Sequence, residues 1–319
     1  MKVNLGLDVG SVSTNLVALD ENRNVIHSSY LLTAGRPVEV VQEAVADLQR
    51  ALPSCSVQAA GTTGSGRELA AQVLGADVIK NEITAHAVAA MSVQPDVRCV
   101  LEIGGQDSKI IILQNGVVTD FAMNTVCAAG TGSFLDRQAQ RLGIDIKDLG
   151  RLALASRNPV RIAGRCAVFA ESDMIHKQQM GCGVEDIVRG LCEALVRNYL
   201  NNVGKGKAIR QPVLFQGGVA ANEGMRSAFE EALGYPVIVP EQHKVMGALG
   251  AAIIASRLET NESRFRGFDL SERRFESRGF ECSRCPNACE VVELLMEGSV
   301  VARWGGRCGR WERSDAAGA

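Results

Sequence analysis

Two matching segments constrain the fold of this chain more than any other feature of its sequence. An apolar run, a glycine turn, a second apolar run, a polar turn and a third run follow one another near the N-terminus and again in residues 97–123. In the N-terminal copy apolar and polar side chains alternate, as they do in half-buried strands. A shift of 94 positions places Asp8 on Glu102 and Gly10 on Gly104 without a gap. We interpret the two segments as an internal duplication of one α/β unit.

The rest of the chain alternates between helical and strand periodicities, which is typical of α/β proteins. The patterns predict helices at 38–52, 184–203, from 223 and at 246–258, and strands at 212–216 and 237–239. We therefore expect one α/β domain at 1–95, completed by the helix in 243–258, and a second at 96–242. Residues 259–319 are expected to form a charged linker followed by a cysteine-rich tail.

The two glycine turns are candidate sites for a phosphate chain. Glycine lets the backbone approach a ligand closely, and the neighbouring N–H and hydroxyl groups are donors to phosphate oxygens. The sequence contains neither a Walker A motif nor a Rossmann glycine fingerprint. Two turns that close on a phosphate chain from opposite sides are the arrangement that remains, whereas either turn alone is equally well explained as a plain β-turn.

Candidate residues of this site fall into two groups. A carboxylate on each turn can hold a hydrated Mg²⁺ ion, and an amide side chain can orient an attacking water. The candidates for this catalytic work are Asp8, Glu102, Gln106 and Asp107. The candidates for nucleotide binding are Gly10, Ser11, Ser13, Thr14, Gly104, Gly105 and Lys109, with Gly217, Gly218 and Asn222 before a later helix.

Composition excludes several classes of function. The net charge of −2 gives no bulk attraction for nucleic acid or anionic membranes, and no apolar run approaches a membrane span. The strand pattern begins at residue 3 without a signal peptide, so we expect a cytoplasmic protein. Because disulfides are rare in a reducing cytosol, the ten cysteines point to metal or redox chemistry.

Two of the cysteines precede predicted helices. Cys127 is followed by a glycine-rich stretch and then a helical pattern, and Cys166 comes directly before another helical pattern. The N-terminal end of a helix favours a thiolate and an anionic ligand. The alternative is a pair of buried structural thiols, which is our interpretation of Cys55, Cys99 and Cys192. Cys182 lies in a glycine turn and its role stays open.

The tail contains a further set of four cysteines with spacing typical of metal sites. Cys282, Cys285 and Cys289 form a C-x2-C-x3-C pattern, and Cys308 follows in a glycine-rich segment. This set predicts a structural Zn²⁺ site or an iron–sulfur cluster, with free thiols as the alternative.

Several of these motifs resemble one family, the ATPase activators (component A) of 2-hydroxyacyl-CoA dehydratases, which are ATPases of the BadF/BadG/BcrA/BcrD type. The ATPase subunits of benzoyl-CoA reductase and the reductases of double-cubane cluster proteins belong to the same family. The resemblance covers about residues 1–258. It is carried by Asp8–Thr14, Gly104–Lys109, Asn124–Gly132, Cys166–Phe169 and Met246–Gly250.

The resemblance implies the fold and the activity. The fold would be two actin-like (RNase H-like) domains, as in the acetate and sugar kinase, Hsp70 and actin superfamily. The protein would be a homodimer in which Cys127 and Cys166 of both subunits hold one bridging [4Fe–4S] cluster. Binding and hydrolysis of ATP to ADP, with Mg²⁺, would drive one low-potential electron onto a partner. Glu102 is a departure, because the family usually has Asp there.

The resemblance also implies partners. The electron would come from a reduced ferredoxin or flavodoxin, and it would pass to a 2-hydroxyacyl-CoA dehydratase or a related cluster-containing reductase. Two alternatives remain at this point. One is a small-molecule kinase of the same superfamily, acting on a sugar or an acid, and the other is a module that senses ATP without turnover.

Overall fold

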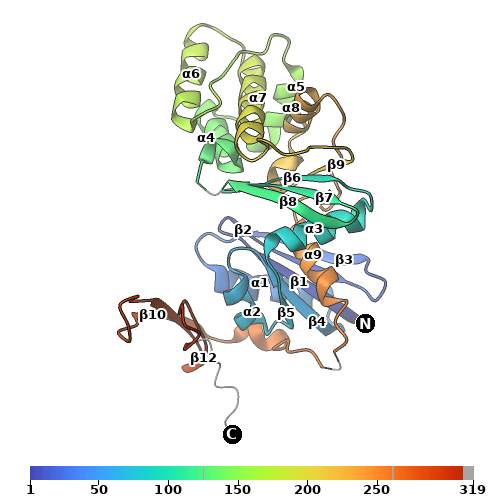
Figure 1. The fold of residues 1–319 in the computed structure, drawn as a ribbon, viewed down its shortest axis with the longest axis vertical. Helices are drawn as coiled ribbons and strands as arrows, with labels where there is room; N and C mark the ends of the chain where they lie inside the picture. The colour runs from blue at the N-terminus through green and yellow to red at the C-terminus, as the bar shows by residue number, and fades with distance from the viewer. Residues whose placement is uncertain (125, 261, 312–319) are drawn as a thin grey trace.

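The computed structural model describes residues 1–124, 126–260 and 262–311. Two sheets lie one above the other along the long axis of the molecule, with helices above, between and below them (Figure 1). No helix among these residues is long and apolar enough to cross a membrane.

The first sheet is built around the N-terminal repeat. Its central strand, β1, is buried on both faces because nearly all of its side chains are small or apolar. β1 pairs antiparallel with β2 and parallel with β4, and the strand order is β3-β2-β1-β4-β5. The strands are β1 (Lys2–Val9), β2 (Ser13–Leu19), β3 (Val25–Leu32), β4 (Ser56–Thr63) and β5 (Val78–Ile79), and α1 (Pro37–Ala51) and α2 (Arg67–Leu74) pack on them.

The second sheet repeats the same hairpin. Leu7 pairs with Leu16 in the first sheet, and Leu101 pairs with Ile110 in the second, which is the register that the 94-residue shift predicts. The strand order is β8-β7-β6-β9. The strands are β6 (Cys99–Ile103), β7 (Ser108–Gln114), β8 (Val117–Asn124) and β9 (Val213–Gln216), and the helices above them are α4 (Gly132–Leu142), α5 (Leu149–Ala155), α6 (Ala167–Gln179), α7 (Val184–Asn202) and α8 (Glu223–Leu233).

Two helices, α3 (Glu82–Val93) and α9 (Met246–Ala255), lie between the sheets (Figure 1). They share one apolar core with inward-facing residues of both sheets. Their backbones approach so closely that only glycine fits at the contacts. A Cβ atom on Gly250 would lie 1.9 Å from the carbonyl oxygen of Ala85, and one on Gly6 of β1 would lie 1.9 Å from that of Ala248. These contacts fix the two sheets on a common pair of helices.

The C-terminal cysteine-rich region folds into a small antiparallel sheet of β10 (Phe275–Glu281), β11 (Glu290–Met296) and β12 (Ser299–Trp304). The charged segment before it packs on the first sheet. It contains the short 3-10 helix η4 (Phe268–Glu272), and the Gln42 side chain of α1 donates to the carbonyl oxygens of Leu270 and Arg273 at 2.8 and 2.7 Å. Leu270, Leu294 and Ala302 are part of the core of the first sheet.

Two other elements differ from their predictions. Residues 237–239, predicted to be a strand, contribute one isolated bridge from Ile238 to Leu214. Pairing ends there because the segment turns away through Pro240. The last helix ends at Ala255 instead of residue 258, although the apolar pattern continues to Leu258. The domain boundaries drawn from the sequence stay a prediction.

Substitution of Gly250 by alanine tests the close packing of the two middle helices. Helix propensity alone would make this change stabilising by about 1 kcal/mol. We expect it instead to lower the free energy of unfolding by about 1–3 kcal/mol, the usual cost of overpacking, because the new Cβ meets the Ala85 carbonyl. Urea unfolding measures the difference. Gly279→Ala, where nothing lies within 4 Å, is the matched control, and equal stability of the two variants would contradict the close contact.

Candidate functional site

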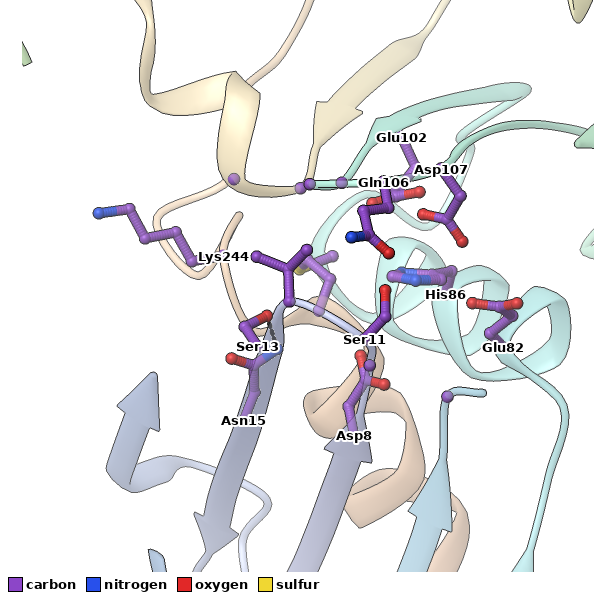
Figure 2. A pocket seen from close by; sticks show the side chains of 18 of the residues that line it. Asp8, Ser11, Ser13, Asn15, Glu82, His86, Glu102, Gln106, Asp107 and Lys244 are labelled. Atoms are coloured by element: carbon purple, nitrogen blue, oxygen red, sulfur yellow. Dashed lines mark hydrogen bonds between the residues drawn. The ribbon is translucent and has the colours of Figure 1, made fainter. Parts of the chain in front are cut away.

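A cavity that is partly open to solvent lies where the two repeated hairpins face each other. Figure 2 shows side chains from both hairpins and from α3 converging on this space. Twelve of the predicted site residues line it: Asp8, Gly10, Ser11, Ser13, Glu102, Gly104, Gly105, Gln106, Asp107, Lys109, Gly217 and Gly218.

The first hairpin turns tightly at the end of β1. The N–H of Gly10 donates to the carbonyl oxygen of Ser13 at 2.9 Å, which closes the turn. The Asp8 carboxyl group is enclosed by two glycines from distant parts of the chain. A Cβ atom on Gly64 would lie 2.4 Å from one carboxylate oxygen of Asp8, and one on Gly247 would lie 2.1 Å from the other. Glycine at both positions is therefore what leaves room for the acid.

Burial dominates the charge state of Asp8. It raises the pKa of the carboxyl group to about 7, although the nearby Lys109 ammonium lowers it. The negative charges of Glu82 and Asp107 add to the upward shift in this pKa. Asp8 is thus a carboxyl group that ionises near neutral pH unless a cation joins it.

The second hairpin contains a buried lysine with three acidic partners. The Lys109 ammonium lies 3.0 Å from Glu102, 2.8 Å from Asp107 and 3.1 Å from Glu82 of α3. Burial alone would lower the pKa of Lys109, but the three carboxylates together raise it above its ordinary value. Burial raises the pKa of Glu102 to about 7 in spite of the same ion pair. Lys109 therefore organises the acids and does not extend freely toward a ligand.

The two hairpins and a third glycine turn are in direct contact. A Cβ atom on Gly105 would lie 2.6 Å from the Val12 side chain at the tip of the first hairpin. Gly217, after β9, has a φ of +92°, and a Cβ there would lie 2.3 Å from the Ile103 carbonyl oxygen. A side chain at either position would push apart the walls of the cavity, so these glycines keep it narrow.

His86 forms part of the cavity wall as a packed residue. It is 6% exposed, and its Nδ1 atom lies 2.7 Å from the Gln216 amide nitrogen. Burial, aided by the charge of Lys109, lowers the pKa of the imidazole to about 3. His86 is therefore neutral throughout the physiological range, and its contact joins α3 to the end of β9.

The structure does not bring two predicted residues to the cavity. The Thr14 hydroxyl is buried and lies 3.0 Å from the Thr33 hydroxyl, because β2 turns this side chain away from the hairpin opening. Asn222 caps α8 by accepting from the Met225 N–H at 3.0 Å. Neither side chain is placed to contact a ligand in the cavity.

Other lining residues were not assigned to the site from the sequence. They include Gly64, Ser65, His243 and Lys244. The Gly64-Ser65-Gly66 turn after β4 was a recognisable signal, because it is a further glycine turn at the end of a strand next to β1. His243 and Lys244 had none, since only the tertiary fold brings the segment before α9 to the hairpins.

The donor set of the cavity fits a hydrated divalent cation and a phosphate chain. Oxygen ligands from carboxylates suit Mg²⁺, and Asp8, Glu82, Glu102 and Asp107 supply them. Against these four acids the lining contains two lysines, of which Lys109 is already paired. Within the described ranges no three His, Cys, Asp or Glu side chains are arranged to enclose an ion by themselves. An ion here would therefore need ligand oxygens as well.

Cys127 and Cys166 both lie directly before helical segments. Cys166 is the N-cap residue of α6, and Cys127 is the N-cap of a three-residue 3-10 turn, η1 (Ala128–Gly130), with α4 starting five residues after Cys127. Both thiols are partly exposed. Val126 is 95% exposed, and Val168 and Phe169 are 69% and 67% exposed. Exposed apolar side chains therefore adjoin each of the two thiols in the sequence.

The remaining cysteines outside the tail differ in burial. Cys99 and Cys192 are core residues as predicted, and burial raises the pKa of each thiol to about 12. Cys55 is less enclosed than predicted, being partly exposed at the start of β4. Cys182 is also partly exposed and packs against the core of the second sheet.

The tail cysteines lie at one end of the small sheet. The C-x2-C-x3-C loop connects β10 to β11, and Cys308 follows β12. Both segments therefore leave the sheet at the same end of its strands. The Trp311 indole N–H donates to the Cys282 sulfur at 3.4 Å and links the two segments. Cys282 is buried whereas Cys285 and Cys308 are exposed.

Comparison with known proteins identifies a family for this chain. The BadF/BadG/BcrA/BcrD ATPase family matches residues 5–255. The (R)-2-hydroxyglutaryl-CoA dehydratase activating ATPase of Acidaminococcus fermentans is 35% identical over 258 residues, which are 79% of this chain and 96% of that protein.

Solved structures give the same result. The crystal structure of the Acidaminococcus fermentans (R)-2-hydroxyglutaryl-CoA dehydratase component A is 32% identical and superposes with a TM-score of 0.75 over 81% of this chain and 98% of that one. The 2-hydroxyisocaproyl-CoA dehydratase activator of Clostridium difficile with bound ADPNP is 32% identical, with a TM-score of 0.71 over 80% and 94% of the two chains.

A more distant likeness concerns the fold alone. A glucokinase of the ROK family from Streptomyces griseus is 13% identical and has a TM-score of 0.50, covering 80% of this chain and all of that one. The two sheets thus have the fold that actin-like ATPases and sugar kinases share, as predicted. With the family match across both sheets and the identity to the dehydratase activator, the chain belongs to the BadF/BadG/BcrA/BcrD ATPase family.

Proposed function

We propose that this protein is an ATP-hydrolysing one-electron donor that acts as a homodimer and holds one bridging [4Fe–4S] cluster. The observation that supports it most is the setting of Cys127 and Cys166. Each is partly exposed, caps the start of a helical segment and adjoins exposed apolar side chains. Two thiols are half of the ligands that a cubane cluster needs, and a two-fold symmetric pair of chains supplies four.

In this proposal the nucleotide binds in the cavity between the hairpins. The backbone N–H groups of both turns, with the hydroxyls of Ser11 and Ser13, bind the phosphate chain. Asp8 and Glu102 hold the water shell of Mg²⁺, and Gln106 orients the attacking water. Lys109 acts indirectly, because it keeps Asp107 and Glu102 in position without using its charge on the phosphates.

The cluster, when bound, supplies a low-potential electron. The chain's own residues determine its surroundings. Cys127 directly precedes the 3-10 turn η1 and Cys166 directly precedes α6, so the fold places each sulfur at the start of a helical segment. The apolar side chains of Val126, Val168 and Phe169 exclude water once they are covered by the second subunit.

The names of the relatives support the choice of partner. The similar proteins are described as activators of 2-hydroxyglutaryl-CoA and 2-hydroxyisocaproyl-CoA dehydratases. We accordingly propose that a 2-hydroxyacyl-CoA dehydratase, or a related cluster-containing reductase, accepts the electron. A reduced ferredoxin or flavodoxin in the cytoplasm would supply it.

Iron analysis after anaerobic purification tests the proposal. We expect about four iron and four sulfide atoms per dimer and a visible spectrum typical of such clusters. Cys127→Ser should abolish the cluster and leave nucleotide binding measurable, because the thiol lies outside the nucleotide cavity. Cys55→Ser, a partly exposed thiol of the first sheet, is the control and should keep its iron. Full iron in Cys127→Ser would show that the ligand assignment is wrong, and an iron-free dimer that phosphorylates a sugar would establish the kinase alternative.

The raised pKa values of the cavity acids predict how magnesium binding depends on pH. With Asp8 and Glu102 titrating at about 7, protons compete with the ion below that pH. The affinity for Mg²⁺ with ADPNP should therefore rise between about pH 6 and 8, by up to tenfold per pH unit for each group. Calorimetry measures this slope, and Glu102→Gln should reduce it. A flat pH profile in the unaltered protein would contradict the role of these acids.

The same pKa shifts have a consequence for the metal-free protein. Both folded-state values lie above those of the unfolded chain, so the folded state retains protons that the unfolded state releases. Stability should therefore decline as pH rises from about 4 to 7 and level off above that range. Bound magnesium should remove this decline.

For the tail we propose that Cys282, Cys285, Cys289 and Cys308, which are not gathered around one point in this structure, close on one further metal centre, either Zn²⁺ or a second iron–sulfur cluster. A three-stranded sheet has little core of its own, and a closed four-thiolate site stabilises folds of this size. Metal analysis of Cys127→Ser/Cys166→Ser protein should find about one zinc, or one iron–sulfur cluster, per chain. Adding Cys285→Ser and Cys308→Ser should remove it. Metal-free protein with four titratable tail thiols would contradict the site.

A further inference from the structure

The start of α4 is bonded directly to the second hairpin. The N–H of Gly132 donates to the carbonyl oxygen of Gly104, and the N–H of Ser133 donates to that of Gly105, both at 2.8 Å. The Ser133 hydroxyl also donates to the Gly105 carbonyl. Gly104 and Gly105 line the nucleotide cavity, whereas α4 belongs to the segment that follows Cys127.

Peptide geometry relates these bonds to the cavity. A trans peptide is a rigid plane whose C=O and N–H point in opposite directions. The Gly104 carbonyl shares its plane with the Gly105 N–H, and the Gly105 carbonyl shares its plane with the Gln106 N–H. A phosphate that turns either N–H toward itself must therefore move the carbonyl that α4 holds.

Gly132 brings α4 close enough for this contact. A Cβ atom on it would lie 2.9 Å from the Gly104 carbonyl oxygen and 3.4 Å from the Gly105 Cα atom. Any larger residue would therefore separate the helix from the hairpin.

The segment between α4 and Cys127 is short and tightly bonded. Thr131 donates to the Ala128 carbonyl oxygen through its N–H at 3.1 Å and its hydroxyl at 2.9 Å. The Asn124 side chain accepts from the Cys127 N–H at 3.0 Å and donates to the Cys127 carbonyl at 2.9 Å. A shift of the α4 start is thus passed to Cys127 and is not absorbed by a loose loop.

A second contact extends this connection toward Cys166. Asn198 of α7 is 4% exposed and donates to the Gly164 carbonyl oxygen at 2.6 Å, two residues before Cys166. Gly130, in the turn after Cys127, lies against the same amide, because a Cβ there would be 2.7 Å from its oxygen. Both cysteine-containing segments therefore contact one buried side chain, that of Asn198.

We propose that Gly132 and Ser133 are positioning residues that connect the phosphate-binding Gly104–Gly105 turn to the Cys127 segment, so that the nucleotide state alters the setting of the thiol. The proposal rests on the proposed function for the nucleotide cavity and the role of Cys127. It requires only the bonds described above and a small rotation of two peptides.

Thiol reactivity in the metal-free protein tests this connection. The alkylation rates of Cys127 and Cys166 are measured by mass spectrometry with and without Mg·ADPNP. We expect the nucleotide to change the Cys127 rate in the unaltered protein. In Ser133→Ala the ratio of the Cys127 rates with and without Mg·ADPNP should move about fivefold closer to one. This factor corresponds to the loss of one typical hydrogen bond. Calorimetric affinity for Mg·ADPNP should stay within about twofold, because Ser133 does not line the cavity.

Ser172→Ala is the matched control, because this exposed serine of α6 bonds only within its own helix, to the Val168 carbonyl. It should leave the rate ratio unchanged. Gly132→Ala should abolish the nucleotide effect, and its circular dichroism and melting temperature show whether it folds. A Ser133→Ala protein with the unaltered ratio, or a Cys127 rate that ignores nucleotide in the unaltered protein, would overturn the inference. Iron content is measured separately, so a failure of the proposed cluster would be distinguished from a failure of this inference.

Discussion

The cavity between the two hairpins depends on one buried cation. Lys109 lies on β7 and holds Glu102 of β6, Asp107 of the hairpin turn and Glu82 of α3, which is the helix between the sheets. Without that charge, the buried Glu102 and the partly exposed Asp107 and Glu82 would lie close together with no cation among them, so their mutual repulsion would be uncompensated. The lysine therefore makes an acidic cavity compatible with a folded chain, and it connects the second hairpin to the helix that both sheets share.

Much of the fold could be predicted from the sequence because the decisive signals are local. Apolar alternation, glycine turns and helical spacing located the hairpins and the long helices, and the duplication predicted the register of Leu101 on Ile110. The prediction of a strand at 237–239 was wrong, because a short apolar run does not reveal whether a neighbouring strand is available along its full length. The sequence did not reveal that the charged segment 259–278 packs on the first sheet, because only its few aromatic and aliphatic residues, such as Leu270, make that contact.

The site was predictable to the extent that its residues lie on the repeated hairpins. Asp8, Glu102 and the turn glycines are adjacent to strands whose ends must meet. The role of Lys109 as the partner of three acids was not predicted, because its pairing with Glu82 depends on how α3 packs against β7. The importance of Gly64 and Gly247 was equally hidden, since each is needed only to leave room for the Asp8 carboxylate. Thr14 was misassigned because neighbours on a strand face opposite sides.

The shared core between the small C-terminal sheet and the first sheet affects how this protein can be shortened. A chain cut after residue 258 would have about the length of its relatives, whose matched segments cover 79% of this chain. It would also lose Leu270, Leu294 and Ala302, and would uncover α1 and its neighbours on the first sheet. Such a fragment would expose apolar surface on the first sheet that the full chain covers. The C-terminal sheet is therefore a structural part of the N-terminal one, and a boundary drawn at residue 258 would cut through a shared core.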